Sequence, residues 1–221
     1  MFEKLTCYAN AEFELCAEGP VLVSSGQSHK TNPTLPDKTF MKGYVGKNHS
    51  EECYVIPGSS IKGVLRHHIQ DFYLNGQETE GLFGKIIGGA QKSKIKFNDA
   101  FAVPETIVTA VRNSTKIDPN SQSPVGGSLN NMEIVEKGTF KAGFQIKNFT
   151  LKEIEMLLLS LHDSDTGAVR FGGKVSRGFG KMKIGSFMLT ACKGYDKDLN
   201  PIDKVTFFDI EEAIKFFREV K

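Results

Sequence analysis

Cysteines are few in this sequence and none stands in a close C-x-x-C pair; the four are Cys7, Cys16, Cys53 and Cys192. Because zinc sites usually draw thiols from such pairs, the spacing favours free thiols over a zinc site built from scattered Cys and His. No stretch approaches the roughly 20 apolar residues that a membrane-spanning helix needs, and the N-terminus shows no apolar signal region. The sequence therefore predicts a reduced, cytoplasmic protein with no membrane partner.

A strong excess of either charge is also lacking. The 221 residues carry 28 Lys and Arg against 26 Asp and Glu, a formal net charge of +2, so the total does not indicate a nucleic-acid binder. The distribution is more informative, because residues 166–195 contain six bases and no acid, and residues 81–98 contain four lysines and no acid. This segregation predicts a positive stripe on a nearly neutral protein, which a phosphate chain requires.

Hydrophobic periodicity predicts a mixed order of strands and helices. Strands are predicted at 5–16, 53–56, 95–103, 107–111, 132–146 and 181–189, and helices from Ser59-Ser60 to about Asn75-Gly76, over 151–161, and from an Asp209 cap through Phe216 and Phe217. This order is typical of one α+β domain over 1–221, with a ferredoxin-like (RRM-like) antiparallel sheet, two packing helices and added hairpins. Residues 18–52 lack a sustained period and predict a long inserted loop.

Three segments carry a family likeness. They are 56–63 (IPGSSIKG, followed by Leu65-Arg66), 81–84 (GLFG) and 172–181 (GGKVSRGFGK). Together, in order and spacing, they resemble the RAMP superfamily over roughly positions 5 to 190, and the length fits the guide-RNA-binding backbone subunits of type III CRISPR effector complexes. The resemblance implies four kinds of partner: CRISPR guide RNA, complementary target RNA, copies of the chain itself and other effector subunits.

The first segment also has a physical interpretation of its own. Ser59 and Ser60 would place hydroxyls and free N–H groups at a helix N-terminus, where partial positive charge favours a phosphate. Lys62 and Arg66 share one helix face, and Gly63 between them leaves room for a sugar-phosphate backbone. The alternative is an ordinary helix cap followed by solvated bases.

The third segment predicts a phosphate-cradling loop. Its glycines allow positive φ angles and expose successive N–H donors, while its bases supply charge; the candidate RNA-binding residues are Gly172, Gly173, Lys174, Arg177, Gly178 and Lys181. The spacing does not match a nucleotide-binding G-x-G-x-x-G. The alternative is a mobile glycine-rich turn.

Residues from about 112 to 140 resemble the family's thumb, an inserted β-hairpin that wedges into the guide–target duplex. Arg112 and Lys116 are its candidate RNA-binding residues, and Met132, Ile134 and Val135 could supply an apolar wedge. The same three residues could belong to a core strand instead, which is the favoured role for Ile134.

Backbone subunits of this family cleave target RNA with an aspartate in the loop before the helix motif, assisted by a divalent metal. Asp37 is the one acid between Gly19 and Ser50, so the resemblance implies a catalytic Asp37 with Mg²⁺ or another divalent cation as cofactor. A solvated loop acid is the alternative, and it would leave a non-catalytic scaffold without a cofactor.

His67 and His68 suggest a second kind of enzyme, a metal-independent guide-processing endoribonuclease with histidine as general base. Such relatives usually carry two ferredoxin-like halves, whereas one is visible here. His68 falls near the apolar side of the predicted helix, which favours a core histidine.

Overall fold

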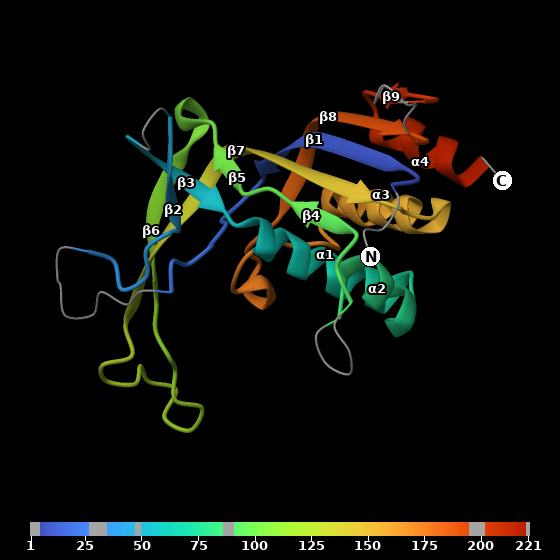
Figure 1. Ribbon diagram of the computed structural model, residues 1–221. Helices are drawn as coiled ribbons and strands as arrows, with labels where there is room; N and C mark the ends of the chain where they lie inside the picture. The colour runs from blue at the N-terminus through green and yellow to red at the C-terminus, as the bar shows by residue number, and fades with distance from the viewer. Residues whose placement is uncertain (1–4, 27–34, 47–49, 86–90, 195–201, 220–221) are drawn as a thin grey trace.

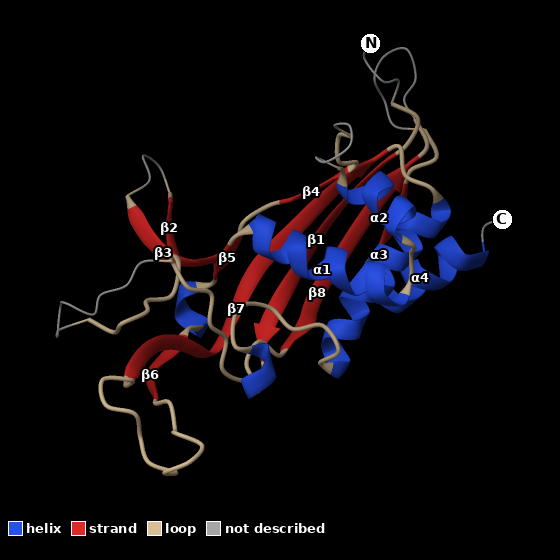
Figure 2. Cartoon of the chain, turned by 90° about the horizontal axis from the view of Figure 1, so that it is seen from below, coloured by secondary structure: helices blue, strands red, loops and turns tan. Residues whose placement is uncertain are grey.

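The computed structural model describes residues 5–26, 35–46, 50–85, 91–194 and 202–219. It is a mixed α/β structure in which a large antiparallel sheet carries helices on one face, as Figures 1 and 2 show. The strands are β1 Tyr8–Ala17, β2 Lys42–Val45, β3 Glu51–Ile56, β4 Ile95–Phe97, β5 Ala100–Ala102, β6 Val108–Ser114, β7 Asn130–Lys147, β8 Met182–Cys192 and β9 Val205–Phe207. The helices are α1 Gly58–Phe72, α2 Gly76–Phe83, α3 Leu151–Thr166 and α4 Ile210–Glu219.

The sheet has the order β2-β3-β5-β7-β1-β8-β9, with β4 and β6 also paired to β7. β1 lies inside the sheet and alternates between buried and more exposed side chains, so its period-two pattern indicates one covered face. Ala9, Ala11, Phe13 and Leu15 supply the covered side and are at most 3% exposed. Strand β1 and the helices on this face therefore enclose the main core.

Helix α1 begins differently from the sequence prediction. The prediction of a cap at Ser59-Ser60 is wrong. The helix starts at Gly58, and the residue before it, Pro57, has no side-chain group that could cap the first turn. Asp99, which is distant in the sequence, supplies the cap instead: its Oδ1 accepts the Gly58 N–H at 2.8 Å. A Cβ at Gly58 would lie 2.5 Å from the Phe97 carbonyl oxygen, so glycine is needed for this close approach.

The other helix ends follow local capping chemistry. Asn75 does not end a helix but caps α2 in a capping box with Glu78, which explains a helix that periodicity missed. Thr150 and Glu153 form the same box on α3, which runs beyond the predicted 161 to Thr166. The Asp209 cap is confirmed, since its Oδ1 accepts the Glu212 N–H at 2.9 Å.

The predicted loop over 18–52 is partly ordered by pairing with distant strands. Val21 bridges Val135, Lys38 bridges Met132 in parallel, and Ser24 bridges Phe40. Strand β2 also lies in this interval and pairs with β3. Within the described residues of this interval, Val21 and Lys38 therefore add to β7, and β2 adds to β3. The predicted strand at 95–103 is two short strands, β4 and β5, that both pair with β7.

The hairpin β6–β7 extends away from the body (Figure 1). Its connection, 115–129, is mostly exposed, whereas the residues proposed as an apolar wedge are not. Met132, Ile134 and Val135 are at most 2% exposed, and the first two pack with Leu22 and Phe179 in a small second core. The core role for Ile134 is confirmed, and the wedge role for these three residues is wrong.

The four cysteines are free thiols, as predicted, and Cys53 and Cys192 are buried. Within the ranges that the structure describes, no helix has the length and apolar character to cross a bilayer.

The glycine-rich loop packs directly against the chain that follows β1. Gly172 has φ +90°, and a Cβ there would lie 2.4 Å from the Leu22 carbonyl oxygen. Gly180 has φ +86°, and its Cβ would lie 2.4 Å from the Phe171 carbonyl oxygen. Gly178 shares the φ of +86° but has open space around it. The loop is thus a close-packed turn whose glycines serve different purposes.

We expect Gly180→Ala to destabilise the protein more than Gly178→Ala. Both substitutions force a left-handed backbone on an L-residue, at about 1–2 kcal/mol, but Gly180→Ala adds a backbone clash worth a further 1–3 kcal/mol or so. Urea unfolding monitored by circular dichroism measures both variants. Equal losses of unfolding free energy would contradict the close packing.

Candidate nucleic-acid interface

The start of α1 and the glycine-rich loop meet at one cavity of about 560 Å³. The α1 side supplies Ser59, Ser60, Gly63 and His67, and the loop side supplies Gly172, Gly173 and Lys174. Lys38, Val64 and the segment 22–24 complete the lining. Two motifs separated by more than a hundred residues in the sequence are therefore brought to the same place.

A second cavity, of about 300 Å³, continues along α1. It shares Ser59 and Gly63 with the first, and adds Lys62, Arg66, Lys85 and the Phe83-Gly84 part of the second motif. A Cβ at Gly63 would find no atom within 4 Å, so this position is open where the two cavities join. We call the combined surface the α1 groove.

Like charges gather in the α1 groove. Burial lowers the pKa of Lys174, and the neighbouring cations of Arg177 and Lys38 lower it further. Burial also lowers the pKa of Lys62, with Arg66 adding to the effect. These lysines contact hydroxyls: the Nζ of Lys62 donates to Ser93 Oγ at 2.9 Å, and that of Lys174 approaches Ser114 Oγ at 3.5 Å.

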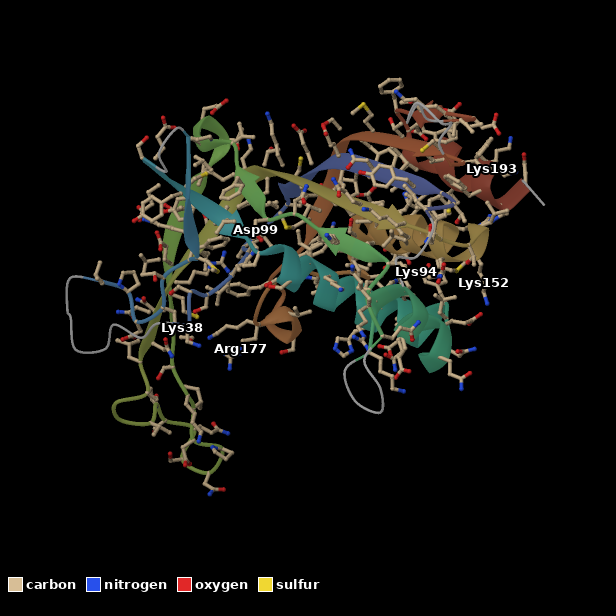
Figure 3. The ribbon with its side chains drawn as sticks, in the orientation of Figure 1. Lys38, Lys94, Asp99, Lys152, Arg177 and Lys193 are labelled. Atoms are coloured by element: carbon tan, nitrogen blue, oxygen red, sulfur yellow. The ribbon has the colours of Figure 1, made fainter. Side chains whose placement is uncertain are left out.

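An anion between these groups would relieve both the repulsion and the lost hydration. The geometry thus gives the α1 groove the chemistry of a phosphate site. Figure 3 shows Lys38 and Arg177 on the same side of the molecule, below the junction of the hairpin and the body.

Not every predicted RNA-binding residue lines the α1 groove. Arg177 and Gly178 lie beside it, at the end of the short 3₁₀ turn Val175–Arg177. Arg112 and Lys116 are exposed on the hairpin, where Arg112 pairs with Glu136 at 3.4 Å. Lys181 lines neither cavity; its Nζ pairs with Glu18 at 3.0 Å, because the β1–β8 pairing brings those two residues together.

The prediction of free amides in the two motifs is wrong at several positions. The Gly58 N–H donates to Asp99, and the Ser60 N–H donates to the Pro57 carbonyl at 2.9 Å. The Gly173 N–H donates to the Leu22 carbonyl at 2.8 Å, and the Gly178 N–H to Val175 at 3.0 Å. Because these donors are used within the fold, cationic side chains and serine hydroxyls are the main groups left for a phosphate.

Asp37 is not a freely solvated acid. Its Oδ2 accepts the Asn131 N–H at 2.8 Å, and the next residue, Lys38, donates its own N–H to the Asn131 carbonyl at 3.1 Å. The half-buried carboxylate is therefore tied to β7, one residue from a lysine that lines the α1 groove.

Asp37 and the neighbouring Asn131 carry oxygen atoms of the kind that a divalent cation binds. Asn131 donates its backbone N–H to Asp37. The side-chain Oδ1 of the same Asn131 is buried and has no hydrogen-bond partner within the described part of the chain. Mg²⁺ is typically held by one or two carboxylates, with phosphates and water completing the shell. Among the described residues, no three His, Cys, Asp or Glu side chains are grouped for an all-protein site.

His68 is a core histidine, as predicted. It is 8% exposed, and its Nε2 lies 2.8 Å from Asp163 Oδ2, which also accepts the Tyr73 hydroxyl. His67 instead lines the α1 groove. Sequence reasoning also missed Lys38, which lies in an aperiodic segment, and Lys85, for which the acid-free stretch at 81–98 was an available signal.

The uncovered face of the sheet has a different character. A cavity of about 540 Å³ there is lined by three acids, Glu12, Glu14 and Asp99, and by one base, Lys141. This charge balance disfavours a phosphate chain. The α1 groove is therefore the better candidate for nucleic acid.

We expect Arg177→Ala to raise the pKa of Lys174, because it removes the neighbouring cation that lowers this pKa more. Lys38→Ala should raise the same pKa less, and Arg177→Lys, which keeps the charge, should leave it nearly unchanged. Side-chain ¹³C NMR titration of the lysines measures all three. An unchanged Lys174 pKa in Arg177→Ala would exclude the charge cluster.

Comparison with known proteins agrees with the arrangement of these motifs. The family model of the RAMP superfamily matches residues 18–183. No curated protein matches the chain in sequence. Among solved structures, the chain is similar in fold to one in the cryo-EM structure of the type III-B Cmr-beta bound to cognate target RNA, with a TM-score of 0.61 and 18% sequence identity.

That alignment covers 82% of this chain and 60% of the solved chain, so this protein spans about three fifths of the length of the chain it matches. The family match includes both sides of the α1 groove and the hairpin. The chain belongs to the RAMP superfamily.

Proposed function

We propose that this protein is a guide-RNA-binding backbone subunit of a type III CRISPR effector complex. The observation that carries the proposal is the α1 groove, where the first-helix and glycine-loop motifs line one cavity beside a cluster of cations. Membership in the RAMP superfamily and the fold shared with a chain of the type III-B Cmr-beta structure support it.

The guide is held through its backbone. Lys38, Lys62, Arg66 and Lys174 face successive phosphates, and Gly63 lets the strand approach α1 closely. Such contacts position a strand without reading its bases, so binding is indifferent to guide sequence. The core order β5-β7-β1-β8, with α1 and α3 in the connections, supports a ferredoxin-like interpretation of the domain that carries the groove.

Copies of the chain stack along the guide in the cytoplasm, beside other effector subunits, and the β6–β7 hairpin acts as the thumb in the guide–target duplex. Its exposed apolar side chains are better placed for a wedge than the buried ones predicted from sequence: Val111 is 58% exposed, Ile117 51% and Leu129 60%. Arg112 and Lys116 on the same hairpin contribute charge beside the duplex.

Target cleavage follows from Asp37 at the edge of the α1 groove. A distorted target strand aligns a ribose 2′-hydroxyl with its own phosphate, and the Asp37 carboxylate orients the attacking oxygen. The 2′-oxygen bonds to phosphorus as the bond to the 5′-oxygen of the next nucleotide breaks, and the proton lost by the 2′-hydroxyl is balanced by protonation of that leaving oxygen, which gives a 2′,3′-cyclic phosphate and a 5′-hydroxyl. A divalent cation held by Asp37 and by RNA oxygens would neutralise charge on that phosphate.

Two alternatives remain as distinct functions. A non-catalytic scaffold would need the α1 groove without Asp37 chemistry. A metal-independent guide-processing enzyme would have to use His67, which lines the α1 groove, as its base, because His68 is buried against Asp163.

We expect Lys174→Ala combined with Arg177→Ala to weaken guide-RNA binding and to reduce the salt slope by about 0.7 per lost phosphate contact. Lys193→Ala with Lys215→Ala is the matched control, because it removes the same charge at the α4 end of the molecule (Figure 3 labels Lys193). Fluorescence anisotropy across a salt series measures both. Equal slopes in the two double variants would reject the α1 groove as the RNA site.

We expect Asp37→Asn, whose amide oxygen can still accept the Asn131 N–H, to abolish magnesium-dependent cutting of complementary target at regular intervals, while guide-RNA affinity is retained. Asp71→Asn, which removes the charge of an exposed acid on α1, is the control. Denaturing gels of target RNA incubated with the guide-loaded protein, with and without Mg²⁺, give the result. Regular cuts by the Asp37 variant would reject its role; protection without cuts by the wild type indicates the scaffold, and cutting without Mg²⁺ the metal-independent enzyme.

A further inference from the structure

We infer that Glu133 is a positioning residue that holds residues 37–41 against the thumb stem and thereby sets Lys38 in the α1 groove, an inference that rests on the proposed RNA binding. Glu133 lies on β7, half-buried, where the hairpin leaves the body. Its Oε2 accepts the Phe40 N–H at 3.0 Å, and its Oε1 accepts the Tyr54 hydroxyl at 2.8 Å. One carboxylate thus joins β7, β3 and the segment that precedes β2.

The backbone around Glu133 shows why this carboxylate matters. Lys38 makes a parallel bridge to β7: its N–H donates to Asn131 and its carbonyl accepts the Glu133 N–H at 2.9 Å. The next donor on that side, two residues along, is the Phe40 N–H. The Glu133 side chain accepts it where backbone pairing to β7 stops. The side chain therefore extends the pairing by one hydrogen bond.

The other edge of the segment is paired as well. The Ser25 N–H donates to the Thr39 carbonyl at 3.2 Å, and the Met41 N–H donates to Val23 at 2.7 Å. Residues 22–24 line the α1 groove together with Lys38. A shift of residues 37–41 away from β7 would therefore displace Lys38 and disturb the wall formed by 22–24.

The Tyr54 hydroxyl is a hydrogen-bond donor to the Glu133 carboxylate that stays protonated over a wide pH range. Burial, followed by the hydrogen bond to Glu133, raises the pKa of Tyr54 to about 12, so its hydroxyl remains a donor even at pH values where an exposed tyrosine ionises. The Tyr54 ring also meets the Phe40 ring edge-on at 5.6 Å between centroids. Phe40 and Tyr54, the two partners of the Glu133 carboxylate, are thus held by ring packing as well as by hydrogen bonds.

Charge and position make opposite predictions for Glu133→Met, which removes the charge and both acceptor oxygens while keeping a side chain of similar length. Glu133 is an acid beside an RNA site, so removing its charge should by itself strengthen the attraction for a phosphate chain. Loss of the Phe40 contact should weaken binding, because Lys38 is no longer held in place. Weaker binding by a variant with one less negative charge identifies the positioning role.

The test compares guide-RNA affinity of the full-length wild type, Glu133→Met, Lys38→Ala and the double variant. We expect Glu133→Met to bind about tenfold more weakly, the equivalent of one buried group left unpaired, and to add little in the Lys38→Ala background. The matched control is Glu12→Met, which removes an exposed acid from the uncovered sheet face and should bind at least as well as wild type. Unchanged or tighter binding by Glu133→Met, or full additivity with Lys38→Ala, overturns the inference.

Amide hydrogen exchange separates this inference from the proposed function. Glu133→Met should accelerate exchange at Phe40 while the β1 amides stay protected, whether or not RNA is bound. If the wild type binds no RNA, the proposed function fails and exchange alone decides: unaltered protection at Phe40 rejects the role of Glu133. Should Glu133→Met not fold, Tyr54→Phe loosens the same carboxylate and should show smaller changes in the same direction; no change in either readout counts against the inference.

Discussion

The pairing of β1 with β7 on one side and β8 on the other is the interaction on which the rest of the structure depends. Its register places Tyr8 opposite both Lys147 and Cys192, and Ala17 opposite both Gly138 and Met182. The chain leaving β1 therefore emerges beside the chain entering β8. For this reason the segment after β1 and the glycine-rich loop before β8 pack together, and α1 needs only to lie alongside them to complete a groove.

Strand β7 connects the core to the projecting hairpin. Its 18 residues pair with β1, β4 and β5 in the body and with β6 beyond it, so the stem of the hairpin is a continuation of a core strand. The segments carrying Val21 and Lys38 add to the same stem. The hairpin and the lining of the groove are consequently joined through one continuous strand.

The positive charges of the α1 groove lie in an unfavourable environment when no anion is bound. Lys62 and Lys174 are partly removed from water and lie near other cations, which is why the pKa of each is lowered. A nearly neutral protein with such a site directs its electrostatic attraction to one strip of its surface instead of spreading it. The acids that line the uncovered sheet face make that face less attractive to an anion than the α1 groove is.

Patterns among neighbouring residues in the sequence were enough to predict part of the fold. Alternation identified β1 and the long strand β7, and capping chemistry identified α4 through Asp209. The apolar side of α1 identified His68 as a core residue. Short elements such as α2, β2 and β9 were missed, because they span too few residues to show a period.

By itself, the sequence determined the order of the main elements, the motifs that line the groove and the separation of bases from acids along the chain. Tertiary structure alone decided that Asp99 would cap α1, that Lys181 would pair with Glu18, and that Lys38 would enter the groove. Each of these depends on a partner supplied by strand pairing or packing from elsewhere in the chain. No local pattern records such a contact, since periodicity and capping depend on neighbours within a few residues.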